Sequence, residues 1–161
     1  MKKLIIISGI AAMVYACSGG SDKNNSTADE TGKASSDLFK EEKPNPEVEA
    51  RGIGKFTHVD IASNLDAKMA DAGKGIYDLK CVACHKLTSE KLVGPGWSGV
   101  TKRRHAEWIM NFATNTDEMI NKDPAAQALL EICLVRMPNQ NLSDDDARHV
   151  YEFMRRNDGV K

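Results

Sequence analysis

The chain has 161 residues, 28% of them charged, and its formal net charge at pH 7 is −1. No basic stripe runs along it, which argues against a nucleic-acid-binding protein. Its four cysteines would predict a disulfide scaffold in an exported domain, unless their spacing points to another chemistry.

The first 17 residues have the pattern of a bacterial export signal. Two lysines follow Met1, and residues 4–14 form an apolar run that is too short to span a bilayer. The run ends in Val14-Tyr15-Ala16-Cys17, which resembles a lipobox. We therefore predict a lipid on Cys17; cleavage after Ala16 without lipid is the alternative. Either outcome predicts a location on the periplasmic side of a bacterial membrane.

Residues 18–51 are predicted to be a flexible tether. They are rich in small, polar and charged residues and contain few apolar ones. Such a segment cannot bury enough apolar surface to offset the entropy lost on ordering. A flexible chain of this length spans about 30 Å on average, so a lipid on Cys17 would let the domain move within a shell above the membrane.

Residues 52–161 form the predicted domain, which is long enough for one hydrophobic core. Apolar residues three and four positions apart, with no alternating pattern, predict an all-α fold. The last helix has a clear start because Ser143 and Asp146 fit a capping box. The expected elements are a helix from Asn64 or Leu65 to Cys81, a Gly-Pro loop over 86–100, and helices over 102–114, 124–135 and from Ser143 onward.

Two of these helices have an expected apolar face. In the helix expected over 102–114, Arg104, Trp108 and Phe112 recur at every fourth position. In the helix expected to end at Cys81, the apolar positions are Leu65, Met69, Ala72, Ile76 and Leu79.

The strongest motif is Cys81-Val82-Ala83-Cys84-His85, which reads C-x-x-C-H. Two thiols at this spacing can each bond one vinyl group of a porphyrin, and the following histidine is then placed to bind the iron. A thioredoxin-like redox pair would need a strand–helix context, and a zinc site a second Cys/His pair. No strand–helix context is visible around residue 81. Cys133 stands alone, so it does not supply the second pair of a zinc site. The motif predicts one covalent c-type haem, and Cys133 is expected to be a small buried apolar residue.

Over residues 65–157 the order of helix, C-x-x-C-H, Gly-Pro loop, further helices, Met-Pro and terminal helix resembles a class I cytochrome c. The resemblance implies that the carbonyl of Pro95 accepts a hydrogen bond from the proximal His85. It also implies that the first and last helices cross with a glycine against an aromatic residue, for which Gly73 and Tyr151 are the candidates.

A finer resemblance lies in Gly94-Pro95-Gly96-Trp97-Ser98-Gly99-Val100 and Arg136-Met137-Pro138-Asn139-Gln140-Asn141-Leu142. Both stretches are similar to lipoprotein monohaem cytochromes encoded beside nitrous-oxide reductase in some denitrifying bacteria. The resemblance implies redox partners such as a quinol-oxidising complex as donor and nitrous-oxide reductase as acceptor.

The second axial ligand is expected to be Met137, because it precedes a proline just before the last helix, where the family places its ligand. Met110 and Met119 remain alternatives. The other methionines and histidines are expected to have structural roles: Met69 and Met154 in the core, and His58, His105 and His149 at the surface or as caps.

Haem propionates are anions that need donors. Trp97 and Arg104 are predicted to supply them, with Arg103 and Trp108 as further candidates. The alternative is that both tryptophans are core residues and that Lys102–Arg104 is a solvated face.

Three functions remain open. The first is a membrane-tethered electron carrier, since thioether and imidazole ligands leave the iron no open site. The second is a haem enzyme or gas sensor with a displaceable sixth ligand. The third is a docking lipoprotein that haem merely stabilises. No nucleophile–base pair or second metal site is evident, so an enzyme is not expected.

Overall fold

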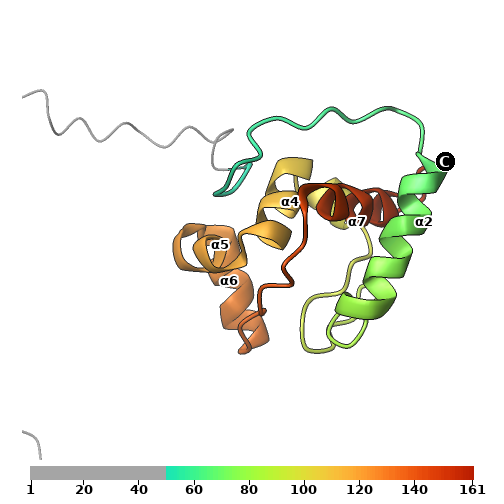
Figure 1. The fold of residues 1–161 in the computed structure, drawn as a ribbon. Helices are drawn as coiled ribbons and strands as arrows, with labels where there is room; N and C mark the ends of the chain where they lie inside the picture. The colour runs from blue at the N-terminus through green and yellow to red at the C-terminus, as the bar shows by residue number, and fades with distance from the viewer. Residues whose placement is uncertain (1–49) are drawn as a thin grey trace, which may run out of the picture. The chain divides into compact units, whose positions relative to one another are not determined.

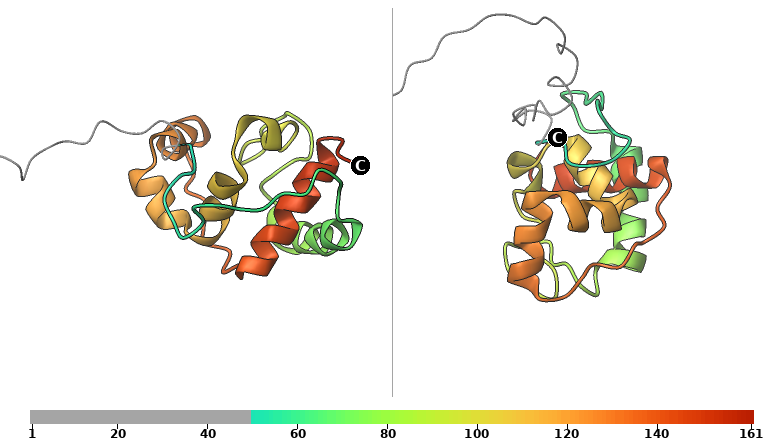
Figure 2. Two further views of the ribbon diagram at one scale, coloured as in Figure 1. Left: turned by 90° about the horizontal axis from the view of Figure 1, so that it is seen from above. Right: turned by 90° about the vertical axis from the view of Figure 1, so that its left-hand side faces the viewer.

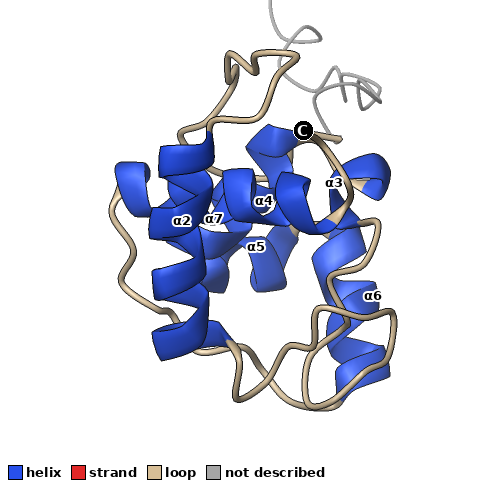
Figure 3. Cartoon of the chain, turned by 90° about the vertical axis from the view of Figure 1, so that its right-hand side faces the viewer, coloured by secondary structure: helices blue, strands red, loops and turns tan. Residues whose placement is uncertain are grey.

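The structure is a computed structural model that describes residues 50–161, and this part of the chain contains helices and loops but no β-strand (Figure 3). The predicted all-α class is confirmed. None of the helices described is long and apolar enough to cross a membrane. The expected export signal, Cys17 and nearly all of the tether lie outside the described residues. The helices are α2 (Ala67–Ile76), the π-helical turn η1 (Tyr77–Cys81), α3 (Val100–Arg103), α4 (Ala106–Thr114), α5 (Thr116–Lys122), α6 (Pro124–Cys133) and α7 (Asp144–Asn157).

Helix α2 begins at Ala67, slightly later than predicted. The carboxylate of Asp66 accepts a hydrogen bond from the backbone N–H of Met69 at 2.9 Å and so caps the helix. The helix continues directly into η1, which ends at Cys81 as expected. The C-x-x-C-H motif therefore starts at the end of a continuous helical segment.

Helix α2 crosses α7, and this crossing is the main helix contact of the domain (Figure 1). Gly73 lies at the crossing, where a Cβ atom would collide with the backbone carbonyl of His149 and approach Cβ of Phe153. The prediction for Gly73 is thus confirmed, but the aromatic partner is Phe153 rather than Tyr151. His149 and Phe153 are four residues apart and share one face of α7, whereas Tyr151 points elsewhere.

The buried face of α2 and η1 is displaced by one position from the expected one. Ala70, Gly73, Tyr77 and Cys81 are buried, while Ala72 is exposed and Leu79 is 85% exposed. The reason is the close helix crossing: it selects the small residues Ala70 and Gly73 for the interface, although they carry a weaker hydrophobic signal.

The helix expected over 102–114 is interrupted. Arg104 is extended, with φ −133° and ψ 141°, so α3 ends before it and α4 begins after His105. Arg104 still lies over Trp108, with its guanidinium carbon 4.5 Å from the ring centre. Helix α5 was not predicted; it is short and lies against α6 (Figure 1).

The two remaining helices begin where they were expected, and α7 has its predicted cap. Pro124 stands in the first turn of α6, and Asp123 caps it by accepting the N–H of Ala126 at 2.8 Å. Leu134 takes a left-handed conformation, with φ 60°, and ends α6 at Cys133. Ser143 and Asp146 form the capping box predicted for α7.

Residues 52–66 cross α5, α4 and α7 as an irregular segment held by polar side chains (Figure 2). Asn111 accepts from the N–H of Phe56, and Glu107 accepts from that of Val59. Glu152, which is fully buried, accepts the N–H of Asp66 and pairs with Arg148 and Arg155. These buried polar groups are all satisfied, so the segment forms part of the folded domain.

The crossing yields a prediction about Gly73. Gly73→Ala should lower the free energy of unfolding by about 1–3 kcal/mol, because the added methyl group must push α7 away. Gly75 is the matched control: it lies in the same helix, and a Cβ atom added there would meet open space. Gly75→Ala should raise stability by up to about 1 kcal/mol through helix propensity. Denaturant unfolding followed by circular dichroism measures both; equal effects of the two substitutions would contradict the crossing.

Candidate haem-binding site

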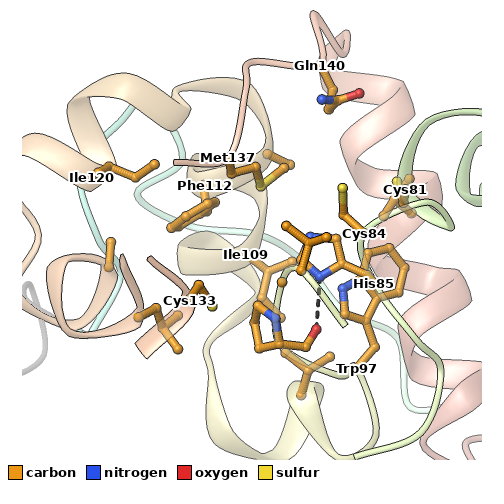
Figure 4. A pocket seen from close by; sticks show the side chains of 18 of the residues that line it. Cys81, Cys84, His85, Trp97, Ile109, Phe112, Ile120, Cys133, Met137 and Gln140 are labelled. Atoms are coloured by element: carbon orange, nitrogen blue, oxygen red, sulfur yellow. Dashed lines mark hydrogen bonds between the residues drawn. The ribbon is translucent and has the colours of Figure 1, made fainter. Parts of the chain in front are cut away.

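A largely apolar cavity of about 240 Å³ lies between the end of η1, the loop around Pro95, helices α4, α6 and α7, and the chain that follows α6 (Figure 4). Its apolar lining includes Ile109, Phe112 and Leu129. The cavity brings together every side chain that sequence reasoning proposed for cofactor binding, namely Cys81, Cys84, His85, Pro95, Trp97, Arg104 and Met137.

The two cysteines lie on a tight turn at one wall. The backbone N–H groups of Cys84 and His85 both donate to the carbonyl of Cys81, at 3.0 and 2.9 Å. The hydroxyl of Tyr77 donates to the carbonyl of His85 at 2.7 Å and holds the end of the turn. Both thiols are free of disulfide bonds, and this turn presents them to one cavity.

The surroundings of the turn do not favour the zinc alternative. Burial raises the pKa of the Cys81 thiol to about 11, so the unliganded thiol is protonated at neutral pH. Within residues 50–161, no three His, Cys, Asp or Glu side chains gather closely enough to hold a metal ion.

His85 is oriented for metal binding through one specific nitrogen. Its Nδ1 lies 2.9 Å from the carbonyl oxygen of Pro95, as predicted for the loop proline. A carbonyl can only accept, so Nδ1 carries the proton and Nε2 keeps its lone pair. Burial lowers the pKa of His85, which keeps the ring neutral despite the opposing effect of the Pro95 hydrogen bond. Gly94 lies so close against the ring that a Cβ atom there would collide with it.

Met137 enters the cavity from a different segment than His85, the chain between α6 and α7 (Figure 4). The two alternative methionines do not line it. Met119 is fully buried and its sulfur accepts the backbone N–H of Ile53 at 2.9 Å, while Met110 is buried on α4 away from the cavity. Met154, expected in the core, is buried and lines the cavity from α7.

His85 is the one histidine among the lining residues, and His58, His105 and His149 lie elsewhere. His58 is exposed and contacts Asp60, and His105 precedes α4. Met137 and Met154 are therefore the methionines that line the same cavity as His85.

Four side chains were considered as propionate donors. The indole N–H of Trp108 donates to Asp123 at 3.2 Å, and Arg103 donates to the carbonyl of Ser98 at 2.6 Å. Trp97 is buried against Tyr77, with ring centres 5.0 Å apart, and lines the cavity. Trp97 and Arg104 thus keep the role as predictions, although Trp97 also has the packing of a core residue.

Other lining residues were not expected. Cys133 is half-buried rather than fully buried and faces the cavity, and Lys80, Arg136 and Gln140 line it as well. Lys80 adjoins the motif and Arg136 adjoins Met137, so nearness in sequence was the only available signal. Cys133 carried none, because its position depends on how α6 packs.

The chemistry of this cavity fits a covalently attached haem. An apolar interior suits the porphyrin, two thiols lie on one turn, and a neutral imidazole presents Nε2. A thioether lies on a separate segment, and cationic Arg104 lies at the wall.

Cys84→Ser should leave haem attached through Cys81 alone or prevent formation of the holoprotein, because only one thioether bond can then form. Pyridine haemochrome analysis measures this as an altered spectrum or a loss of haem per chain. Cys133→Ser is the matched control, since Cys133 lines the same cavity, and it should keep the wild-type haem content and spectrum. The opposite outcome for the two variants would contradict the assignment.

Comparison with known proteins agrees with this geometry. No curated protein matches the chain. Among solved structures, the chain is similar to a cytochrome c from Rhodothermus marinus at 33% identity, with a TM-score of 0.67 and coverage of 71% of this chain and 97% of that one. An engineered form of that protein, Rma TDE, matches at 32% identity and a TM-score of 0.66, covering 71% and 98%.

The engineered form bound to a carbene intermediate, 1-ethoxy-1-oxopropan-2-ylidene, matches at 32% identity and a TM-score of 0.63, again covering 71% and 98%. Residues 70–158 match the family described as cytochrome c. The chain therefore belongs to the cytochrome c family and binds a covalent, iron-containing haem c.

Proposed function

We propose that this protein is a one-electron carrier whose haem iron is bound by His85 and Met137, and that a lipid on Cys17 tethers it to the periplasmic side of a bacterial membrane. One observation carries the ligation: His85 and Met137 line the same cavity from separate segments, while Met110, Met119 and the histidines at 58, 105 and 149 do not line it. Bound haem c supplies an iron that alternates between two oxidation states. Family membership supports electron transfer in general.

The side chains of the cavity divide the work of an electron carrier. Nδ1–H of His85, held by Pro95, keeps the imidazole in one orientation during oxidation and reduction. The Met137 thioether would be the second ligand of the iron, so no ligand would need to enter or leave. A soft sulfur ligand favours the reduced iron and raises the potential. The apolar lining excludes water and so limits the rearrangement of solvent around the iron when its charge changes.

The redox partners belong to the same proposal. The resemblance of residues 94–100 and 136–142 to lipoprotein cytochromes supports a quinol-oxidising complex as donor and nitrous-oxide reductase as acceptor. Residues 18–51 would give the domain the reach to exchange between them.

A haem enzyme or gas sensor is the second candidate. An engineered relative is bound to a carbene intermediate, so this type of domain can accommodate a small ligand after engineering. Carbon monoxide binding discriminates between the electron carrier and the enzyme or sensor. A carrier whose iron has two protein ligands should not bind carbon monoxide readily.

Met137→Ala should keep the covalent haem but bind carbon monoxide, and its near-infrared sulfur-to-iron band should vanish. The midpoint potential should fall, within the roughly 0.8 V over which axial ligands move haem potentials. Met110→Ala is the control, and it should keep the band because Met110 is buried outside the cavity. Loss of the band in Met110→Ala but not in Met137→Ala would reassign the ligand. Ready carbon monoxide binding by the wild type would favour the enzyme or sensor.

Labelled fatty acid should enter the wild type and not Cys17→Ala, which should be released as a soluble protein because no other lipid site is expected. Cys133→Ala should incorporate label like the wild type. A wild-type chain that begins with unmodified Cys17 would replace the lipid proposal with ordinary cleavage after Ala16.

A further inference from the structure

The chain between α6 and α7 carries Met137 without the support of regular structure. Within residues 50–161, no backbone–backbone hydrogen bond involves residues 135–142. Its position therefore depends on side-chain contacts, and these determine how firmly the Met137 thioether is held in the cavity.

The contact nearest to Met137 is made by the preceding residue. The Nη2 atom of Arg136 donates to Oδ1 of Asn121 at 2.8 Å, and to the backbone carbonyl and Oδ1 of Asp117, both at 3.3 Å. Asp117 and Asn121 are four residues apart on α5, so they face Arg136 from one side of that helix.

A second contact lies on the other side of Met137. The amino group of Lys80, the residue before Cys81, donates to the backbone carbonyl of Gln140 at 2.9 Å. This bond links η1 to residues 135–142, which we call the ligand segment. Pro138 adds a local restraint, because a proline disfavours helical backbone in the residue before it. Met137 thus lies in the sequence between two anchored positions, Arg136, which is bonded to α5, and Gln140, which is bonded to η1.

We propose that Arg136 is a positioning residue, which acts through α5 to hold Met137 at the iron and resist its displacement by other ligands. The proposal rests on the His85/Met137 ligation proposed above. It assigns a role to α5: the helix presents two acceptors to the residue beside the ligand.

The chain between α6 and α7 exchanges between a closed state, with Met137 at the iron, and an open state, with Met137 displaced. An external ligand reaches the iron only when Met137 has left it. The apparent affinity of that ligand therefore scales with the fraction of molecules in which Met137 is displaced, the open fraction. The side chain of Arg136 is 43% exposed, so its hydrogen bonds are partly screened by water. Removing them should raise the open fraction by about three- to tenfold.

Imidazole titration of the oxidised holoprotein measures this fraction. Arg136→Ala and Asn121→Ala should each raise the apparent imidazole affinity about three- to tenfold, and Asn121→Ala does so without changing the charge near the iron. The double variant should show little gain over Arg136→Ala, because that substitution already removes the contact with Asn121. Asn121→Asp keeps the acceptor and should stay near the wild type.

Lys122→Ala is the matched control on α5. Lys122 pairs with Glu118 and is not bonded to the ligand segment, so its removal should leave imidazole affinity unchanged even if it lowers the unfolding midpoint. An equal gain in this variant would attribute the effect to general loosening of α5 and overturn the proposal.

The near-infrared sulfur-to-iron band separates the two proposals. If the wild type shows the band and neither Arg136→Ala nor Asn121→Ala gains imidazole affinity, the positioning role is wrong and the ligation stands. If the wild type lacks the band, the ligation fails and the positioning role fails with it. Should Arg136→Ala not yield holoprotein, Asn121→Ala decides alone.

Discussion

The close crossing of α2 and α7 at Gly73 is the constraint on which the rest of the structure depends. Because the glycine has no side chain, the backbone of α7 at His149 lies directly against α2. This contact fixes the direction in which α2 and η1 run and so where the C-x-x-C-H turn begins. Tyr77, one helical turn beyond Gly73, then packs on Phe153 and bonds the carbonyl of His85. The helix crossing and the haem attachment turn are thus joined by one buried side chain.

The two proposed axial ligands are held in different ways. His85 lies on a turn closed by backbone hydrogen bonds, its imidazole is fixed by the carbonyl of Pro95, and Gly94 leaves no free space beside the ring. Met137 lies on a segment supported by side chains from α5 and η1. A backbone hydrogen-bond network usually resists local opening better than partly exposed side-chain contacts do. We therefore expect exchange at the iron, when it occurs, to begin on the Met137 side.

The segment that leads into the domain lies on the opposite face of α4 from the cavity. Asn111 and Glu107 bind residues 52–59, whereas Ile109 and Phe112, on the other side of the helix, line the cavity. Glu152 and Arg155 continue this line of contacts toward Asp66. Burial alone would raise the pKa of Glu152, but hydrogen bonds from Arg148, Asp66 and Arg155 outweigh it and lower that pKa. Residues 52–66 thus pack on a face of the domain that leaves the cavity free.

The sequence alone determined the features that local chemistry controls. The spacing of Cys81, Cys84 and His85 indicated a covalent haem, and Ser143 with Asp146 predicted the start of α7, because thioether spacing and capping need only a few neighbouring residues. Tertiary structure decided which residues meet across the fold. It chose Phe153 over Tyr151 as the partner of Gly73, turned Leu79 outward, interrupted the helix at Arg104 and brought Arg136 to α5. These outcomes depend on contacts between residues far apart in the sequence, whose packing and hydrogen bonds outweigh local propensity.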